Sequence, residues 1–130
     1  MLLSLQIENY ALIRSTNINF SQGFTSICGE TGAGKSILLG ALALVLGQRA
    51  DSEVLLDKEK KCFIEAVFSL SNKLQSLFED NDLDFDVEST FRREILPNGK
   101  SRAFINDTPV SLSVMKQIGD CLVDIHSQHN

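Results

Sequence analysis

A glycine-rich segment near the start of the chain has the residue types and the spacing of a phosphate-binding loop. The segment GETGAGKS, residues 29–36, matches the pattern of a glycine, four residues, then glycine, lysine and serine or threonine. The glycines permit backbone angles that let successive N–H groups point inward around an anion. Lys35 is placed to contact the β and γ phosphates, and the Ser36 hydroxyl is placed to ligate Mg²⁺. The sequence therefore predicts a nucleotide site formed by Gly29, Glu30, Thr31, Gly32, Ala33, Gly34, Lys35 and Ser36.

The segments on either side of this loop provide the structural context that the motif requires. Residues 24–28 are a short apolar run rich in β-forming residues, which predicts a buried strand directly before the loop. Residues 36–47 are an apolar run that predicts a helix ended by Gly47. The positive amino-terminal end of this helix would face the phosphates. Strand, glycine loop and helix is the arrangement expected of a phosphate loop.

Length, charge and cysteine content limit the class of protein. With 130 residues, of which 43% are hydrophobic, the chain forms one domain, or part of one, with a substantial core. The net charge of −5 argues against a broad nucleic-acid-binding surface but is compatible with a local basic patch. Cys28, Cys62 and Cys121 are widely spaced in apolar segments, which indicates reduced, buried thiols in an intracellular protein. The longest apolar run, residues 37–46, is about half of the ~20 residues that span a bilayer, so it predicts a buried helix.

The remaining sequence patterns predict a mixed α/β domain. A helix of residues 71–81 is expected to begin at Ser71, and an amphipathic helix is expected from Pro109 to Gly119. The segment PNGK, residues 97–100, is a hairpin signal between two strands. Strands are predicted by alternation or by β-forming residues at 2–8, 15–20, 62–70, 83–88, 91–96, 101–106 and 121–125.

The carboxyl-terminal segment CLVDIHSQHN supports alternative functions. Asp124 ends an apolar run, as the Mg²⁺-organising aspartate of P-loop enzymes does, and this would make the chain a compact small-molecule kinase. His126 and His129 have the spacing of half a metal site, but no third and fourth ligands stand out. The acidic run of residues 80–86 lacks the glycine and the final glutamate of a calcium loop. A further alternative is a non-enzymatic interaction fragment that binds no nucleotide.

Basic residues gather on the predicted hairpin and have two interpretations. They are candidates for contacts with DNA phosphates. Alternatively, they neutralise the acidic residues beside them in the sequence. The four residues are Arg92, Arg93, Lys100 and Arg102.

Several segments together resemble a known family. The segments LLSLQIENYALI, GETGAGKSILLGALALVLGQRA, GKSRAFINDTPV and LVDIHSQHN look like the amino-terminal part of the RecN family of bacterial DNA repair proteins. This family is similar to the SMC proteins, in which a long coiled coil interrupts a split ABC-type ATPase head. The resemblance covers essentially all of residues 1–130. It implies an α/β fold of the P-loop NTPase class, as the N-terminal lobe of an ABC/SMC-type head with a mixed β subdomain.

The resemblance also implies roles for residues outside the phosphate loop. Gln128 matches the Q-loop glutamine of such heads, which ligates Mg²⁺ and senses the γ-phosphate. Arg49 matches an arginine that lies near the nucleotide. Residues 9–13 match the region near the adenine and ribose, where Tyr10 either contacts the base or packs in the core. Ala11 stands where many relatives carry a basic residue, so a phosphate contact from that position is not expected here.

The activity implied by the resemblance is ATP hydrolysis by the parent protein in double-strand break repair and recombination, in the cytoplasm at the nucleoid. This chain has no ABC signature, no apolar strand ending in Asp-Glu and no later switch histidine. In the family these elements belong to the carboxyl-terminal half of the head. The expected partners are that half, a second head in a homodimer, and DNA. The chain alone is expected to bind ATP and Mg²⁺ without a complete catalytic set.

Overall fold

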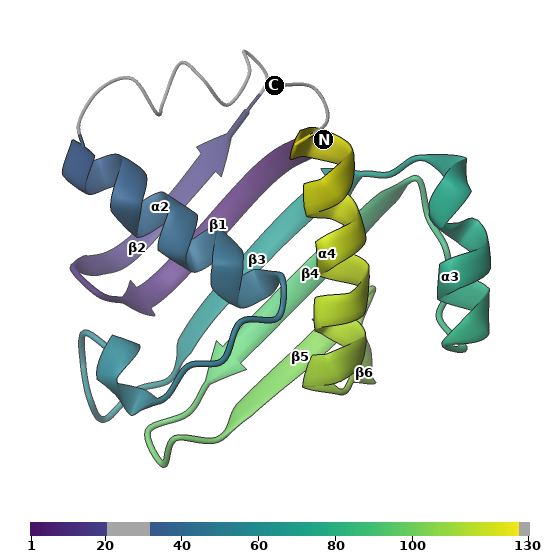
Figure 1. Ribbon diagram of the computed structural model, residues 1–130. Coiled ribbons are helices and arrows are strands. Elements are labelled where there is room, and N and C mark those ends of the chain that lie inside the picture. The colour runs from purple at the N-terminus through teal and green to yellow at the C-terminus, as the bar shows by residue number, and fades with distance from the viewer. Residues whose placement is uncertain (21–31, 128–130) are drawn as a thin grey trace.

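The computed structural model describes residues 1–20 and 32–127, and its central element is a six-stranded sheet (Figure 1). The strand order is β2-β1-β3-β4-β5-β6, and all the neighbouring pairs are antiparallel. The strands are β1 (Leu2–Tyr10), β2 (Ile13–Asn19), β3 (Cys62–Ser69), β4 (Glu88–Ile95), β5 (Ser101–Ile105) and β6 (Thr108–Val110).

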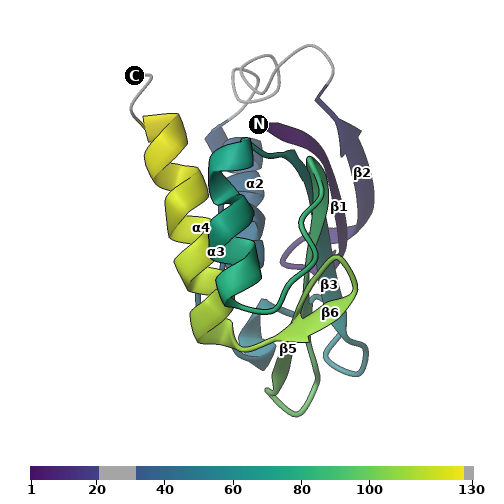
Figure 2. The ribbon, with the colours of Figure 1, turned by 90° about the vertical axis from the view of Figure 1, so that its right-hand side faces the viewer.

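Two long helices cover one face of this sheet. Helix α2 (Gly32–Val45) crosses β2, β1 and β3, and helix α4 (Leu112–Ser127) lies over β4 and β5 (Figure 1). Figure 2 shows both helices and the short helix α3 (Gln75–Asp80) on the same side of the sheet. Two single-turn helices, η1 (Ser52–Val54) and η2 (Asn72–Leu74), lie in the connections. Within the described part of the chain, no helix is both long and apolar enough to cross a membrane.

The alternation of residues in the strands explains the two-layer arrangement. In β3 the side chains of Cys62, Ile64, Ala66 and Phe68 are buried, while those between them are only partly covered. Because successive strand residues point to opposite faces, one face of the sheet carries the core and packs against the helices. The other face carries charged side chains such as Glu65 and Arg92 together with apolar ones such as Phe63.

Most of the predicted elements are confirmed with small changes of boundary. The helix that follows the phosphate loop ends as expected, because Gly47 adopts a φ of +110°, which few other residues tolerate. Ser71 caps the η2–α3 segment by accepting a hydrogen bond of 3.2 Å from the Lys73 N–H. The hairpin of β4 and β5 is present with its turn at residues 97–100. The strand predicted at residues 24–28 lies outside the described residues.

Two predicted strands are wrong. Residues 121–125 belong to α4, because the buried residues Met115, Ile118 and Leu122 continue the helical spacing past Gly119. Residues 83–87 form no strand, because β4 is already paired on both edges, with β3 and β5. This segment instead packs on α3, where Phe85 makes an edge-to-face contact with Phe78 at 5.3 Å between ring centroids.

The structure also contains a strand that the sequence patterns did not predict. Thr108–Val110 forms β6 and pairs with β5, although this region was expected to begin the last helix. Asn106 and Asp107 both adopt positive φ, at 49° and 67°, so they form the kind of two-residue turn that joins tightly paired strands. The Asn106-Asp107 dipeptide was the sequence feature that could have indicated this turn.

Close contact between α4 and Leu46, the residue directly after α2, depends on Gly119. A Cβ added there would collide with the Leu46 carbonyl oxygen and lie 2.9 Å from the Leu46 Cβ. We expect Gly119→Ala to lower the free energy of unfolding by about 1–3 kcal/mol, because the helices must move apart. Urea denaturation measures this, with Gln117→Ala, an exposed position of the same helix, as the control. Equal stability of both variants would mean that the helices separate at no cost.

Candidate functional site

The first turns of α2 present the described part of the phosphate-loop pattern. Helix α2 begins at Gly32, and Gly34, Lys35 and Ser36 are all exposed to solvent. The first N–H groups of a helix have no acceptor within the helix, and its dipole adds partial positive charge at this end. An exposed ammonium and an exposed hydroxyl beside these groups fit the needs of a phosphate chain with bound Mg²⁺. Residues 29–31 of the predicted cradle lie outside the described residues.

A groove of about 470 Å³ runs along this end of α2. One wall is the face of α2 that carries Gly34, Ile37 and Leu38. The other wall is the turn before β2 and β2 itself, with Leu12, Ile13, Arg14, Ser15, Thr16 and Ile18. Because the walls are mostly apolar and Gly34 lies at one of them, the groove suits a planar base attached to phosphates held by the loop. The sequence had indicated this region only through the resemblance.

Tyr10 packs against α2, which confirms the packing alternative. Its ring is half-buried against the core, and a Cβ added at Gly40 would collide with the Tyr10 hydroxyl. Burial, followed by the nearby Cys62, raises the pKa of the Tyr10 hydroxyl. A neutral ring therefore packs against the middle of α2, next to the β1–β2 turn that forms part of one wall of the groove.

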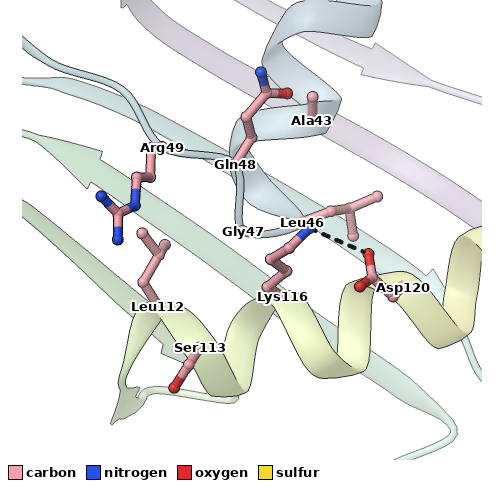
Figure 3. A pocket seen from close by; sticks show the side chains of 9 residues that line it. All are labelled: Ala43, Leu46, Gly47, Gln48, Arg49, Leu112, Ser113, Lys116 and Asp120. Atoms are coloured by element: carbon pink, nitrogen blue, oxygen red, sulfur yellow. Dashed lines mark ion pairs between the residues drawn. The ribbon is translucent and has the colours of Figure 1, made fainter.

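Arg49 lies beyond the opposite end of α2 from the phosphate loop. Helix α2 has 14 residues, which corresponds to about 20 Å. Arg49 lines a pocket of about 540 Å³ between the end of α2 and α4. Figure 3 shows it beside Leu112, with the 3.8 Å ion pair of Lys116 and Asp120 on the neighbouring turns of α4. The contact of Arg49 with a nucleotide stays a prediction, and the length of α2 separates Arg49 from phosphates held at Lys35.

The carboxyl-terminal candidates do not form a site in the described structure. Asp124 and His126 belong to α4, so the strand-end position of Asp124, on which the kinase alternative depended, is wrong. Gln128 and His129 lie outside the described residues. Across residues 1–20 and the described residues from 32 onward, no group of three or more His, Cys, Asp or Glu is placed to hold a metal ion.

Arg93 is a buried structural residue, and its assignment to a DNA contact is wrong. Only 1% of it is exposed. Its Nη1 donates to the carbonyls of Leu44 at 2.8 Å and Gln48 at 2.6 Å, and its Nη2 donates to Ser101 Oγ at 3.2 Å. The Leu44 carbonyl belongs to the last turn of α2, where the helix dipole favours a cation, and Gln48 lies just beyond that helix. The basic neighbours of Arg93 on the hairpin had indicated a surface residue.

Arg92 and Arg102 neutralise acidic residues, which was the alternative interpretation of the basic cluster. Arg92 lies 3.0 Å from the Glu94 carboxylate and 3.4 Å from that of Glu65, and its guanidinium covers the Phe63 ring. Arg102 lies 3.6 Å from Glu94. Burial alone would raise the pKa of Glu94, but hydrogen bonds and charge from Lys61 and Arg92 outweigh it and lower the pKa. Glu94 is therefore an ionised carboxylate that pairs with Lys61, Arg92 and Arg102.

Cys62 is an inert thiol in the core. It is fully buried, and burial raises the pKa of its thiol to about 12, with the Arg93 charge acting in the opposite direction. A thiol with this pKa holds its proton at neutral pH and is neither a nucleophile nor a metal ligand. The expectation of buried thiols is confirmed for Cys62, whereas Cys121 is partly exposed and Cys28 lies outside the described residues.

Asn9 is a structural residue that the sequence patterns did not reveal. It is 8% exposed and adopts a φ of 58°, the left-handed region. Its side chain makes four hydrogen bonds to the backbone of residues 57–61. An asparagine tolerates this backbone conformation better than most residues, but nothing local in the sequence indicates its distant partners. Asn9 therefore links the β1–β2 hairpin to a loop 48–52 residues away in the chain.

Comparison with known proteins agrees with this geometry. Residues 4–126 match a family model described as an AAA domain. The DNA repair protein RecN of Vibrio cholerae is 44% identical over 131 residues, and that of Bacillus subtilis is 37% identical over 133 residues. The matches cover 99% and 100% of this chain but 24% and 23% of those proteins. The chain thus spans about a quarter of the length of these relatives.

Solved structures show the same fold at lower sequence identity. A structure described under ATP-driven dimerization and DNA-stimulated activation of SMC ATPases aligns with a TM-score of 0.67 at 24% identity. It covers 90% of this chain and 76% of that one. The recombination mediator protein RecF aligns with a TM-score of 0.62 at 19% identity, covering 88% of this chain and 29% of that one. The expected fold, the N-terminal lobe of an ABC/SMC-type P-loop ATPase, is confirmed. The chain belongs to the AAA domain family, and over its whole length it is similar to part of the DNA repair protein RecN.

Proposed function

We propose that this chain is the ATP-binding part of an SMC-like ATPase that acts in DNA double-strand break repair and recombination. The observation that carries the proposal is the exposure of Lys35 and Ser36 at the amino-terminal end of α2, beside a groove that suits a base. The similarity to RecN proteins supports the biological role. As part of a DNA repair protein, the chain would act in the cytoplasm at the nucleoid.

In this proposal each residue of the site has a separate task. The backbone N–H groups of residues 29–34 surround the phosphate chain, and Lys35 holds the β and γ phosphates as a point charge. The Ser36 hydroxyl supplies one ligand of Mg²⁺, and Gln128 supplies another. The apolar walls at Leu12, Ile37 and Leu38 enclose the base. A bound ATP-Mg²⁺ supplies a cleavable phosphoanhydride bond, and this chain contributes binding and orientation.

Hydrolysis in this proposal requires partners. Among the described residues that line the groove at this end of α2 there is no Asp, Glu or His. Activation of the attacking water and stabilisation of the transition state would come from the carboxyl-terminal half of the head and from a second head in a homodimer. The compact-kinase alternative lost its main support when Asp124 was found within α4.

The test is ATP binding and phosphate release by the chain alone, and then by the chain mixed with the carboxyl-terminal half of the head. We expect micromolar to millimolar binding by the chain alone and turnover only after mixing. Turnover by the chain alone would instead support a complete small enzyme. No affinity for ATP in the presence of Mg²⁺ would support the non-enzymatic alternative.

A further inference from the structure

A second candidate site lies on the side of the β1–β2 hairpin where the loop of residues 55–61 packs. It is a cleft of about 610 Å³. Three basic side chains line it, from Arg14 on β2 and from Lys58 and Lys60 on the loop, and all three residues are exposed. The other residues that line it are Asn9, Leu56 and Asp57. We call this site the basic cleft.

The two walls of the basic cleft are held together by specific bonds. Asn9 Nδ2 donates to the carbonyls of Asp57 at 3.0 Å, Lys60 at 2.9 Å and Lys61 at 3.3 Å. Asn9 Oδ1 accepts from the Asp57 N–H at 2.6 Å. At the tip of the hairpin, the Ala11 N–H donates to the Val54 carbonyl at 2.7 Å. The loop that carries the two lysines is therefore positioned before any partner binds, which lowers the entropic cost of binding.

The positive charge of the basic cleft is not neutralised by ion pairs. In the described part of the chain, the observed ion pairs involve Lys61, Arg92, Arg102 and Lys116, and none involves a basic residue of the cleft. Lys58 Nζ donates to the carbonyls of Ser52 and Glu53, which carry no formal charge.

The acidic residues that line the basic cleft are fewer than the basic ones. Asp57 is the only carboxylate among the described lining residues, against three basic side chains, and its Oδ1 accepts from the Glu59 N–H at 3.0 Å. Glu59 is exposed on the same loop and does not line the cleft. The basic cluster on the β4–β5 hairpin differs, because Arg92 and Arg102 form ion pairs there with Glu65 and Glu94.

We propose that the basic cleft binds the phosphate backbone of duplex DNA. This inference rests on the proposed function in DNA repair and assigns its DNA contact to residues other than those of the β4–β5 hairpin. Two lysines and an arginine on a fixed loop and hairpin suit contacts that position a duplex without reading its sequence. Binding is therefore independent of sequence and falls steeply as salt is raised. On a chain with a net charge of −5, such a local patch determines where the duplex lies.

The experiment compares two double variants that remove the same charge. Lys58→Gln/Lys60→Gln alters the basic cleft, and Lys100→Gln/Arg102→Gln alters the β4–β5 hairpin. Fluorescence anisotropy of a labelled duplex gives the dissociation constant of each protein between about 50 and about 200 mM salt. We expect the cleft variant to bind about tenfold more weakly at about 50 mM salt, with the salt slope reduced by about 1.8, since each phosphate contact contributes about 0.9. The hairpin variant should retain the affinity of the unmodified chain within about twofold.

Three results would overturn the proposal. An equal loss in both variants would mean that only total charge matters. A larger loss in the hairpin variant would place the contact on β4 and β5. No DNA binding by the unmodified chain at the lowest salt concentration would remove the site altogether. ATP titration of the same proteins separates these results from a failure of the proposed function, because Lys58 and Lys60 do not line the nucleotide groove. Arg14 is left unchanged since it lines both sites.

Discussion

Lys35→Ala is expected to abolish measurable ATP binding by this chain. Lys35 is exposed at the amino-terminal end of α2, where its ammonium is the cation that the phosphate-loop pattern directs at the β and γ phosphates. Two charge-assisted hydrogen bonds to phosphate, at about 1.5–3 kcal/mol each, correspond to a loss of affinity of at least about 100-fold. Isothermal titration with ATP and Mg²⁺ measures the effect, because heat is recorded without any need for turnover.

The matched control for this prediction is Lys73→Ala. Lys73 is also an exposed lysine, located in η2, and it lines neither the nucleotide groove nor the basic cleft. Its substitution removes the same charge and should leave the ATP affinity within about twofold of the unmodified chain. If Lys35→Ala bound ATP as tightly as the control does, the assignment of residues 29–36 as a phosphate loop would be incorrect.

Arg93→Met is expected to lower the stability of the fold more than Gly119→Ala does. The methionine fills much of the apolar volume but donates no hydrogen bond, so the carbonyls of Leu44 and Gln48 lose a buried donor at the end of α2. Leaving buried polar groups unpaired costs about 1–3 kcal/mol for each group. We therefore expect the free energy of unfolding to fall by about 2–4 kcal/mol, measured by urea denaturation at neutral pH.

Two further variants test the cause of this loss. Arg93→Lys keeps the charge but replaces the planar guanidinium by a single ammonium, so it should lie between the methionine variant and the unmodified chain. Arg102→Met changes an exposed arginine on the next strand and should alter stability by less than about 1 kcal/mol. Stability of Arg93→Met equal to that of Arg102→Met would show that the cation at the end of α2 is not needed for folding.

The local patterns in the sequence were sufficient for helix α2 and for most strands, and they predict the phosphate loop. A glycine loop followed by lysine and serine has few other uses, and Gly47 marked the end of α2 because its backbone angle is disfavoured for other residues. The alternation in β1 and β3 and the turn at residues 97–100 were equally direct. These features depend on neighbours in the chain, which a sequence displays.

The errors arose where distant contacts decide the structure. Residues 121–125 have the composition of a strand but continue α4. The reason is that Met115, Ile118 and Leu122 form one face of that helix and are buried in the core. Residues 83–87 alternate like a strand, yet both edges of β4 were already paired. Periodicity reports which residues are apolar, and it does not report which partners remain available.

By itself, the sequence predicted a phosphate loop at the start of an apolar helix, in an α/β domain that resembles a RecN-type head. Only the tertiary structure decided the fate of the basic residues. Arg93 is buried under α2, and Arg92 forms an ion pair with Glu94. By contrast, Arg14, Lys58 and Lys60 line one cleft although they come from segments more than forty residues apart. The physical reason is that the type of a side chain fixes only the charge that it can carry. Whether that charge is buried, neutralised or exposed depends on groups that only folding brings beside it.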